Sequence, residues 1–422
     1  MAEIDGQEKA VCASCFEDEY LRQVVTDDGG PALCEVCGVE QPKTYSLSRL
    51  GEILGAKIQE HYAQGDEVRR SGPDDDDWFV QEGEPLEFVV QEILGQYFDF
   101  NDEIVRAVID AEVVWPPDGD IPFFEDTANY VEKPVFTYAR QMQWDDVLQD
   151  LKHGHRFFSH AARLLFKELF GDIDKMKCWG TDSHERSSVV ELLAQGSLIY
   201  RARGCDSDEQ LVSMLKDPFL NVGPPPPKRA RTGRMNSEGV SMFYGAKDVE
   251  TCLAEIRPPL GGESAVIAMQ TSRPLRLLDF TRFSGVYRPL SYFQSDFTEE
   301  TERFAFLRRL GRLISKPIIP GREADYLITQ TMAEYLAHEQ EPPFDGVLFS
   351  SVQRAEGVNI VVFPQPSRDE LGNPLFPLNY VADSFQVFST RAITYAHHEI
   401  HKRLEGNVVV QEYDPLEDSD EE

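Results

Sequence analysis

The chain has no long uncharged apolar run and is poor in positive charge. No window approaches the roughly eighteen apolar residues that a membrane-spanning helix needs, and the first ten residues lack the basic-then-apolar pattern of a secretory signal. We therefore expect a soluble, cytoplasmic protein without a membrane partner. Of its 422 residues, 41 are Lys or Arg and 74 are Asp or Glu, a formal net charge of −33. This charge disfavours binding to nucleic acid, and a phosphate-bearing ligand would need a local basic site.

Cysteine is also scarce. Seven cysteines in a chain of this length do not form a disulfide framework. Four of them make two Cys-x-x-Cys pairs, Cys12 with Cys15 and Cys34 with Cys37, separated by eighteen residues. This spacing predicts a zinc ribbon in which four thiolates hold one metal ion, with a short hairpin turning at Asp27–Gly30. Because the protein supplies all four ligands, the predicted zinc is structural.

Hydrophobic residues make up 41% of the chain, which is enough for real cores and excludes wholesale disorder. Changes of composition and periodicity predict a multidomain α+β protein. We expect a zinc ribbon at residues 1–44, a helical domain at 45–190, a mixed α/β domain at 191–400 and an acidic disordered tail at 409–422.

The helical domain is predicted from apolar residues that recur at intervals of three, four or seven. The strongest pattern predicts a helix between Asp145 and Phe170, with Gly171 as its stop. Two acidic segments rich in Pro and Gly, Gly72–Asp77 and Trp115–Asp120, are predicted to be loops. We interpret this part as a helical bundle.

After about residue 187 the pattern changes to short β-rich runs that alternate with helices. The predicted strands are Leu198–Arg201, Val240–Tyr244, Ala265–Met269, Leu275–Asp279, Gly346–Phe349 and Asn359–Phe363. The predicted helices are Val249–Arg257, Phe304–Ile314 and Ala324–Leu336. A proline-stiffened basic loop, Gly223–Arg231, lies among them in an otherwise acidic protein.

The residues with chemical potential follow this basic loop. A Gly-rich turn presents Arg234 and Asn236, the next strand ends in Tyr244, and the following helix carries Glu255 among apolar neighbours. A carboxylate at the edge of a buried face is costly unless a cation meets it, so we expect Arg201 or Arg234 beside Glu255.

Five segments together resemble the RES domain family. They are IYRAR (199–203), GRMNSEG (233–239), MFYGA (242–246), TCLAEIR (251–257) and GVLFSSVQRAEGVNIVVF (346–363). The resemblance implies a fold like that of ADP-ribosyltransferases and an NAD-consuming enzyme, often a toxin. The segment DLKHGHRFF (150–158) is similar to the HEPN-like domains that precede many RES domains.

The resemblance implies a role for several positions of this sequence. The family arginine, glutamate and serine correspond to the catalytic set Arg201, Glu255 and Ser351, and substrate binding is assigned to Arg234, Asn236 and Tyr244. Ser350 is adjacent to Ser351, so the serine assignment stays open between the two. Without the resemblance, Arg201 and Glu255 would be interpreted as a structural ion pair.

NAD chemistry calls for residues of these types. Loss of nicotinamide leaves an oxocarbenium-like ribose, which a carboxylate such as Glu255 stabilises, and guanidinium groups bind the pyrophosphate. We therefore predict an NAD glycohydrolase or phosphorylase, with NAD as substrate and a structural zinc. The alternatives are transfer of ADP-ribose to a protein or nucleic acid, and a HEPN-type factor acting on RNA. Arg156 and His160 lie closer together than in the HEPN nuclease motif. The helical domain is assigned to an inhibitory partner protein or to homo-oligomerisation.

Overall fold

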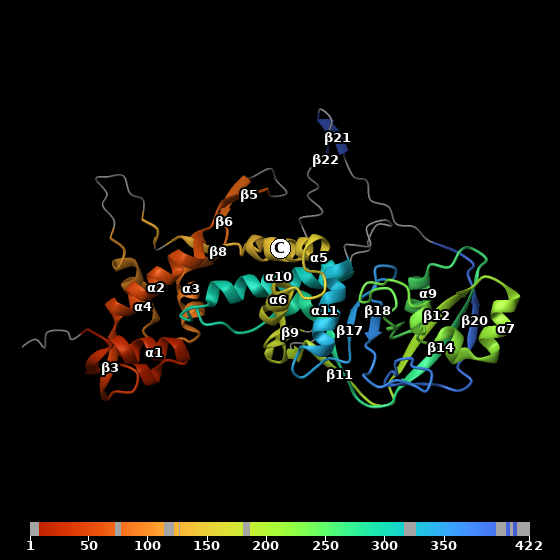
Figure 1. The fold of residues 1–422 in the computed structure, drawn as a ribbon. Coiled ribbons are helices and arrows are strands. Elements are labelled where there is room, and N and C mark those ends of the chain that lie inside the picture. Colours follow the sequence, from red (N-terminus) through yellow and green to blue (C-terminus); the bar gives the residue numbers. More distant parts are fainter. Residues whose placement is uncertain are drawn as a thin grey trace, which may run out of the picture. The chain divides into compact units, whose positions relative to one another are not determined.

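The computed structural model describes residues 8–71, 77–113, 122–125, 127–179, 186–315, 326–393, 402–405 and 408–411. The chain forms two compact units (Figure 1). The first combines residues 1–190 with 279–335, and the second combines residues 191–278 with 336–422. Within the described ranges, no helix has both the length and the apolarity to cross a bilayer.

The cysteine-rich segment of the first unit contains a helix where we predicted a hairpin. Its elements are β1 (Ala10–Cys12), η1 (Ala13–Cys15), α1 (Glu19–Asp28), β2 (Gly30–Leu33) and β3 (Glu40–Ser46), with sheet order β1-β3-β2. The hairpin prediction is wrong because Asp18 caps α1 by accepting a hydrogen bond from the Leu21 N–H at 2.8 Å. Leu21 and Val25, four residues apart, are then fully buried on one face of the helix.

The rest of the first unit mixes helices with small sheets. Up to residue 190 its elements are α2 (Leu47–His61), β4 (Tyr62–Gln64), β5 (Glu67–Ser71), β6 (Asp77–Gln81), β7 (Glu84–Pro85), α3 (Leu86–Leu94), α4 (Asn101–Asp110), β8 (Asn129–Glu132), α5 (Tyr138–His153), α6 (His160–Phe170), η3 (Ile173–Lys175), β9 (Lys177–Trp179) and β10 (Arg186–Ser188). The later segment adds η5 (Phe280–Gly285), β16 (Val286–Tyr287), α10 (Phe297–Ser315) and most of α11 (Leu327–His338). Of the predicted acidic loops, residues 72–76 and all of Trp115–Asp120 fall outside the described residues, while Asp77 begins β6.

One hydrophobic core runs through the cysteine-rich segment and the helices that follow it. Its buried side chains include Val11, Phe16, Leu21, Val25 and Tyr45 from the former and Leu50, Leu54, Ile58, Val89, Ile93, Ile104 and Val108 from α2, α3 and α4. Residues on both sides of position 44, where we predicted a domain boundary, therefore share a single core.

The predicted helix 145–170 is two helices. α5 ends at His153 and α6 begins at His160, so Arg156 lies in the connection between them. Asp150 accepts hydrogen bonds from the Ser159 hydroxyl at 2.8 Å and the His155 N–H at 3.2 Å, while Ser159 caps α6. These side-chain bonds compete with helical backbone bonds and stop α5.

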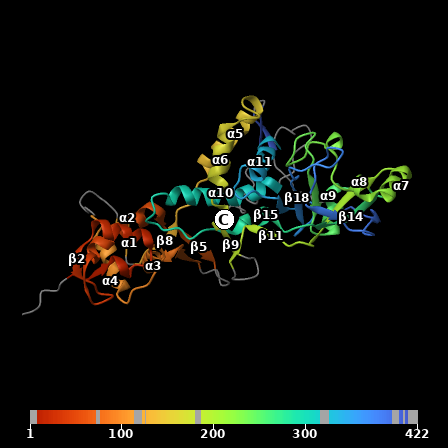
Figure 2. The same ribbon diagram turned by 60° about the horizontal axis from the view of Figure 1, so that its bottom comes forward.

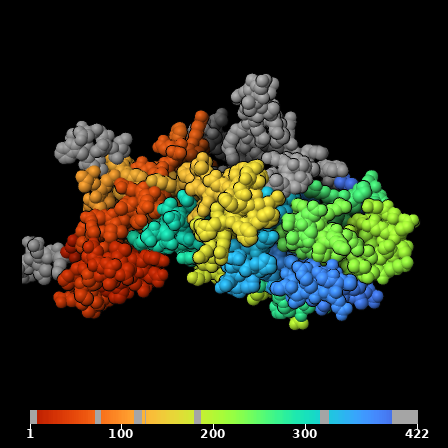
Figure 3. Space-filling view, viewed as in Figure 1, coloured from red at the N-terminus to blue at the C-terminus, as the bar shows by residue number. Residues whose placement is uncertain are grey.

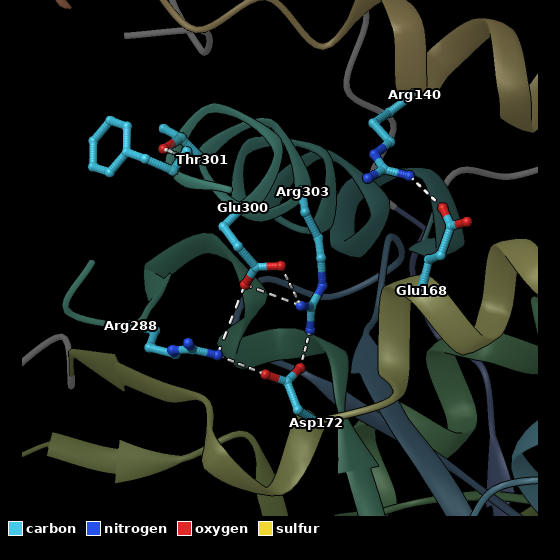
Figure 4. Close-up of polar contacts among 8 residues, drawn as sticks. Arg140, Glu168, Asp172, Arg288, Glu300, Thr301 and Arg303 are labelled. Atoms are coloured by element: carbon cyan, nitrogen blue, oxygen red, sulfur yellow. Dashed lines mark hydrogen bonds and ion pairs between the residues drawn. The ribbon is translucent and has the colours of Figure 1, made fainter. Parts of the chain in front are cut away.

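A buried ion-pair network ties α10 to the earlier part of the first unit (Figure 4). Arg303 of α10 bonds Asp172 and also Glu300 at 2.8 Å, and Arg288 reaches Asp172 at 2.8 Å. Burial alone would raise the pKa of Asp172, but Arg303 and Arg288 outweigh it and lower that pKa below its usual value. Asp172 is thus ionised and holds the segment 279–335 to the earlier part of the first unit through these two arginines.

The second unit is built on a nine-stranded sheet. Its elements are β11 (Val190–Leu193), β12 (Leu198–Cys205), α7 (Asp208–Lys216), α8 (Pro218–Val222), η4 (Pro227–Arg229), β13 (Phe243–Ala246), α9 (Val249–Ile256), β14 (Glu263–Thr271), β15 (Leu275–Asp279), β17 (Gly346–Ser350), β18 (Val358–Val362), β19 (Leu378–Tyr380) and β20 (Gln386–Ser389). The strand order is β11-β15-β17-β18-β13-β12-β14-β19, with β20 also paired to β14. In both ribbon views, α7 and α9 lie beside the part of this sheet that contains β14 and β18 (Figure 2).

Most predicted elements of this unit are confirmed, and two differ. β15 matches its predicted range, whereas the predicted strand 240–244 begins only at Phe243. Val240 and Ser241 belong to the preceding loop, where the Val240 carbonyl accepts from Asn236 and the Ser241 hydroxyl donates to the Pro225 carbonyl. At the C-terminal end, residues 409–411 belong to β22 (Val408–Gln411), paired with β21 (Lys402–Glu405), and not to a disordered tail. Residues 412–422 fall outside the described residues.

Candidate functional site

The second unit has a cavity of about 320 Å³ where β12, β13, β17 and β18 meet α9 and the Gly-rich turn that carries Arg234. Its lining residues are Arg201, Ala202, Arg234, Tyr244, Gly245, Cys252, Glu255, Ile256, Phe349, Asn359 and Ile360. In the space-filling view, the light-green part of this unit adjoins its blue part, so segments far apart in the sequence lie side by side at the surface (Figure 3). The sheet brings four of the six predicted site residues to this cavity: Arg201, Arg234, Tyr244 and Glu255.

Glu255 lies in the last turn of α9, whose first turn is capped by Asp248. Its Oε1 accepts hydrogen bonds from the Ser351 hydroxyl at 2.5 Å and from the Asn359 side-chain amide at 2.8 Å. We expected an arginine against this carboxylate, yet in the described part of the chain its bonded partners are these two neutral donors. The side chain is exposed to solvent, so it does not need an ion pair to be accommodated.

Ser351, and not Ser350, is the serine that meets Glu255. Ser350 ends β17, and Ser351 opens a tight loop whose backbone closes by a bond from the Ser351 N–H to the Gly357 carbonyl at 2.7 Å. A Cβ at Gly357 would lie 2.8 Å from the Thr251 hydroxyl and 3.1 Å from the Ser351 Cβ, so only glycine fits against α9 here.

A second contact fastens the same loop to α9. The Arg354 guanidinium bonds Asp248 at 2.5 Å and the Thr251 hydroxyl at 3.0 Å. Asp248 therefore caps α9 and pairs with the loop at once, and its pKa is lowered by the Thr251 and Arg354 contacts against the opposing effect of burial. These contacts hold the loop that begins at Ser351 against α9 and so fix the distance between Ser351 and Glu255.

Arg201 projects from β12 into the cavity and is held by backbone carbonyls. Its guanidinium donates to the Val222 carbonyl at 2.8 Å and to the Tyr244 carbonyl, and it lies 5.7 Å from the centre of the Phe243 ring. Burial and the nearby charge of Arg203 lower its pKa to about 10, so the group stays cationic at neutral pH. Since its described bonded partners are neutral, its charge remains available to an anionic ligand.

Tyr244 and Asn236 shape the loop that carries Arg234. The Tyr244 hydroxyl donates to Asn236 Oδ1 at 2.7 Å and accepts from the Met235 N–H at 2.9 Å. A Cβ at Gly233 would lie 2.6 Å from Asn236 Oδ1 and 2.7 Å from the Tyr244 hydroxyl. The predicted Gly-rich turn is thus required by these two side chains.

This geometry gives the three residues different positions relative to the cavity. Asn236 is buried, its amide donates to the carbonyls of the loop itself, and it is absent from the cavity lining. The Tyr244 ring lines the cavity, although its hydroxyl is engaged inside the loop. Arg234 also lines it and lies 5.5 Å from the centre of the Phe349 ring, a cation–π distance.

Three cavity residues were missed at the level of sequence. Asn359, 5% exposed on β18, orients Glu255, and Phe349 supports Arg234. Cys252 is buried on α9 with its thiol bonded to the Tyr200 carbonyl, and burial raises its pKa to about 12. Asn359 lies inside the motif GVNIVVF, so its polar side chain in an apolar strand was the available signal.

In the first unit, the four N-terminal cysteines form one cluster. The ligand atoms of Cys12, Cys15, Cys34 and Cys37 all lie within 4.8 Å of one another, and none of the four is in a disulfide. The sulfur of Cys12 is 3.4 Å from that of Cys15 and 3.9 Å from that of Cys37. Four thiolates at about 2.3 Å around a tetrahedral zinc have sulfurs about 3.8 Å apart, so the cluster fits zinc.

The backbone favours the thiolate form of Cys34, whereas burial raises the pKa of Cys15 in the same cluster. Burial raises the pKa of Cys34, but the N–H groups of Cys37, Cys12 and Val36 outweigh it and lower that pKa to about 7. A sulfur that accepts several backbone bonds is suited to bind a cation.

The second unit is thus a mixed α+β domain with a cationic cavity and one oriented carboxylate. Residues 198–382 match the family model of the RES domain, so this part of the chain is a RES domain. This confirms the resemblance for that part of the chain. No finding identifies a HEPN domain in the N-terminal half, and that assignment stays a prediction. No curated protein and no solved structure matches the chain.

Proposed function

We propose that the protein is an NAD-degrading enzyme that cleaves the bond between nicotinamide and ribose. The observation that carries this proposal is the Glu255 carboxylate, oriented by Ser351 and Asn359 at a cavity that also contains Arg201 and Arg234. All five residues belong to the segment that matches the RES domain.

The cavity suits part of a dinucleotide. Its volume of about 320 Å³ is at the small end of ligand pockets, and it is open to solvent, so NAD would fill it with the nicotinamide end and leave the adenosine outside. Arg201 and Arg234 would bind the pyrophosphate, and the Tyr244 ring would stack on the nicotinamide.

The reaction follows from the charges. The C1′–N bond of NAD breaks with both electrons passing to the ring nitrogen, which makes nicotinamide neutral and leaves a cationic ribose. Glu255 stabilises that cation, and a water oxygen bonds to C1′ and releases one proton to Glu255 or solvent. The products are nicotinamide, ADP-ribose and a proton. With inorganic phosphate as acceptor, a phosphate oxygen bonds to C1′ instead and gives ADP-ribose 1″-phosphate.

The exposure of Glu255 also supports a second candidate. A carboxylate open to solvent leaves room for an acceptor larger than water, so transfer of ADP-ribose to a macromolecule uses the same cation and the same residues. Incubation with labelled NAD distinguishes the two, since only transfer leaves label on protein or nucleic acid. Within the family context, we further propose that the activity serves a toxin.

The test is NAD loss and product identity with the purified full chain, with and without phosphate. Glu255→Gln keeps the size and the hydrogen-bond acceptor but removes the charge, and we expect turnover to fall about a hundredfold or more. Ser350→Ala, a change of the neighbouring serine that does not touch Glu255, is the matched control. Equal NAD turnover in Glu255→Gln and wild type would refute the mechanism. A toxin should arrest growth on expression, and Glu255→Gln should abolish the arrest.

A further inference from the structure

The cavity of the second unit offers a small set of groups to a ligand. Among the described residues, its charged side chains are Arg201, Arg234 and Glu255, and its aromatic rings are those of Tyr244 and Phe349. These groups suit a ribose that carries a pyridinium ring on C1′ and one phosphate on C5′. Adenosine is commonly recognised by an acidic side chain on its ribose, and the described lining contains no acidic residue besides Glu255.

The size of the cavity leads to the same conclusion. Its volume of about 320 Å³ lies at the low end of the roughly 300–1,000 Å³ range of ligand pockets, which bury most of the surface of their ligands. Nicotinamide mononucleotide consists of the ring, one ribose and one phosphate, and has about half of the non-hydrogen atoms of NAD. The cavity therefore encloses the mononucleotide more completely than the dinucleotide.

Arg201 keeps a hydrogen-bond donor for an anion inside this cavity. Its Nε donates to the Val222 carbonyl at 2.8 Å and its Nη1 donates to the Tyr244 carbonyl. Within the described part of the chain its Nη2 has no bonded partner, and the guanidinium lines the cavity. The two carbonyl bonds fix the plane of the group, so a phosphate that enters the cavity meets a donor already in position.

A terminal phosphate interacts with this arginine more strongly than a bridging one. A phosphate monoester carries a charge of about −1.5 to −2 at pH 7, whereas each phosphate of the pyrophosphate in NAD has a single acidic oxygen. The attraction to a guanidinium rises with that charge. The gain at Arg201 thus offsets the contacts that the adenosine half would make outside the cavity.

We propose that the site also cleaves nicotinamide mononucleotide, and that it recognises pyridinium ribose phosphates as a class and not only the complete dinucleotide. This inference rests on the proposed function, because it assigns the same chemistry to a smaller substrate. The C1′–N bond breaks with both electrons passing to the ring nitrogen, and Glu255 stabilises the ribosyl cation. A water oxygen bonds to C1′ and releases one proton, so the products are nicotinamide, ribose 5-phosphate and a proton.

The experiment measures nicotinamide release by the purified full chain from NAD, nicotinamide mononucleotide and nicotinamide riboside, which lacks the phosphate. Each assay is run with and without inorganic phosphate, so that either acceptor is present. We expect kcat/KM for the mononucleotide to lie within about tenfold of that for NAD, because the adenosine half adds little binding. The riboside should be cleaved at least about tenfold less efficiently than the mononucleotide, since it has no phosphate for Arg201.

Arg201→Gln tests the link between this side chain and the phosphate. Glutamine keeps an amide donor but loses the charge, so the ratio of kcat/KM between mononucleotide and riboside should fall at least about fivefold. Arg203→Gln is the matched control, since Arg203 lies two residues further along β12, bonds the Asn221 carbonyl at 2.7 Å and is absent from the cavity lining. This control should keep the ratio within about twofold of wild type. Glu255→Gln should lower the turnover of NAD and of the mononucleotide by the same factor, as expected when one site cleaves both.

The proposal is overturned when NAD is cleaved but the mononucleotide is cleaved more than about tenfold less efficiently, a result that leaves the proposed function intact. It is also overturned when mononucleotide cleavage survives Glu255→Gln, or when Arg201→Gln and Arg203→Gln change the ratio alike. Cleavage of the mononucleotide without cleavage of NAD would refute the proposed function alone, and cleavage of neither would refute both. Because the first comparison uses the wild-type chain, it does not depend on whether a variant folds.

Discussion

The hydrogen bond from Ser351 to Glu255 predicts different roles for Ser351 and its neighbour Ser350. Ser351→Ala removes a donor that fixes the carboxylate, whereas Ser350→Ala removes a hydroxyl at the exposed end of β17. We expect Ser351→Ala to lower kcat for NAD loss about tenfold, the value of one hydrogen bond to a charged group. The kcat of Ser350→Ala for NAD loss should stay within about twofold of wild type, because this change leaves the hydrogen bond to Glu255 in place.

Rescue by a conservative variant shows whether Ser351 positions the carboxylate or only fills space. Without the hydroxyl, Glu255 loses one of its two side-chain donors, so Ser351→Ala should lower kcat with little change in KM. Ser351→Thr keeps the hydroxyl and should restore much of the activity. Equal rates in Ser351→Ala and Ser350→Ala would remove Ser351 from the site.

At the scale of elements, Asp172 fastens α10 to the end of α6 through Arg303 and Arg288. Asp172→Asn leaves two guanidinium groups without their partner, one of them on a side chain only 7% exposed. We expect the free energy of unfolding at pH 7 to fall by about 3 kcal/mol. All four tryptophans lie before residue 190, so tryptophan fluorescence during urea unfolding follows the first unit.

The free energy of unfolding that Asp172→Asn loses should depend on pH, and the direction follows from the pKa of Asp172. The pKa of Asp172 is lowered on folding, so its contribution is complete above the unfolded value of about 3.9 and is lost as the pH falls through the folded pKa. The gap between wild type and Asp172→Asn should therefore narrow on acidification from pH 5 to below pH 3. Asp146→Asn, an exposed change on α5, is the control and should leave stability unchanged at every pH. A gap that stays constant with pH would exclude the charge as its cause.

Elements governed by local periodicity were predictable from the sequence, and those governed by side-chain bonds were not. β15 matches its predicted range because Leu275, Leu277 and Leu278 are buried in a short run that ends at Asp279. The break between α5 and α6 depends on Asp150 bonding Ser159 nine residues later, which periodicity does not reveal. Helix α1 was hidden by a turn-like Asp-Asp-Gly-Gly sequence that serves as its C-terminal end.

In the candidate site too, some residues were predictable from the sequence and others were not. Arg201, Glu255 and Arg234 could be assigned because five segments resemble the RES domain family; without that resemblance, Arg201 and Glu255 would be interpreted as a structural ion pair. The partners of these residues were not predictable, since Asn359 reaches Glu255 only through the pairing of β13 with β18 beside α9.

At the scale of the molecule, the shared core makes the four-cysteine cluster a support for the whole first unit. Phe16 and Val11, beside the cysteines, pack in the same cluster as α2, α3 and α4. We expect about one zinc per chain by metal analysis, and Cys12→Ser with Cys34→Ser should abolish it. The same variant should unfold at several kcal/mol lower stability by tryptophan fluorescence.

The second unit provides the contrast for this experiment. Its cavity is made by residues between 201 and 360, none of them in the zinc cluster, so intrinsic NAD turnover should survive where the variant is folded. Cys205→Ser, outside the cluster, should keep both zinc and stability. Full zinc content in a variant that lacks all four N-terminal cysteines would disprove the zinc site.

The segment 279–335 makes the two units dependent on each other along the chain. It lies inside the RES match of residues 198–382, yet it folds with the first unit, where Phe304, Phe306, Leu307, Leu310 and Ile314 of α10 are buried. Burying each such side chain contributes about 1.5–3 kcal/mol. A fragment of residues 191–422 would therefore expose this apolar face, and we expect it to aggregate by size-exclusion chromatography.

Co-expression of residues 1–190 as a separate chain should restore a soluble complex that degrades NAD. The fragment carrying Phe306→Ser and Leu310→Asp should stay soluble by itself, because only the apolar face drives its aggregation. A monodisperse wild-type fragment would show instead that the RES domain folds without the first unit.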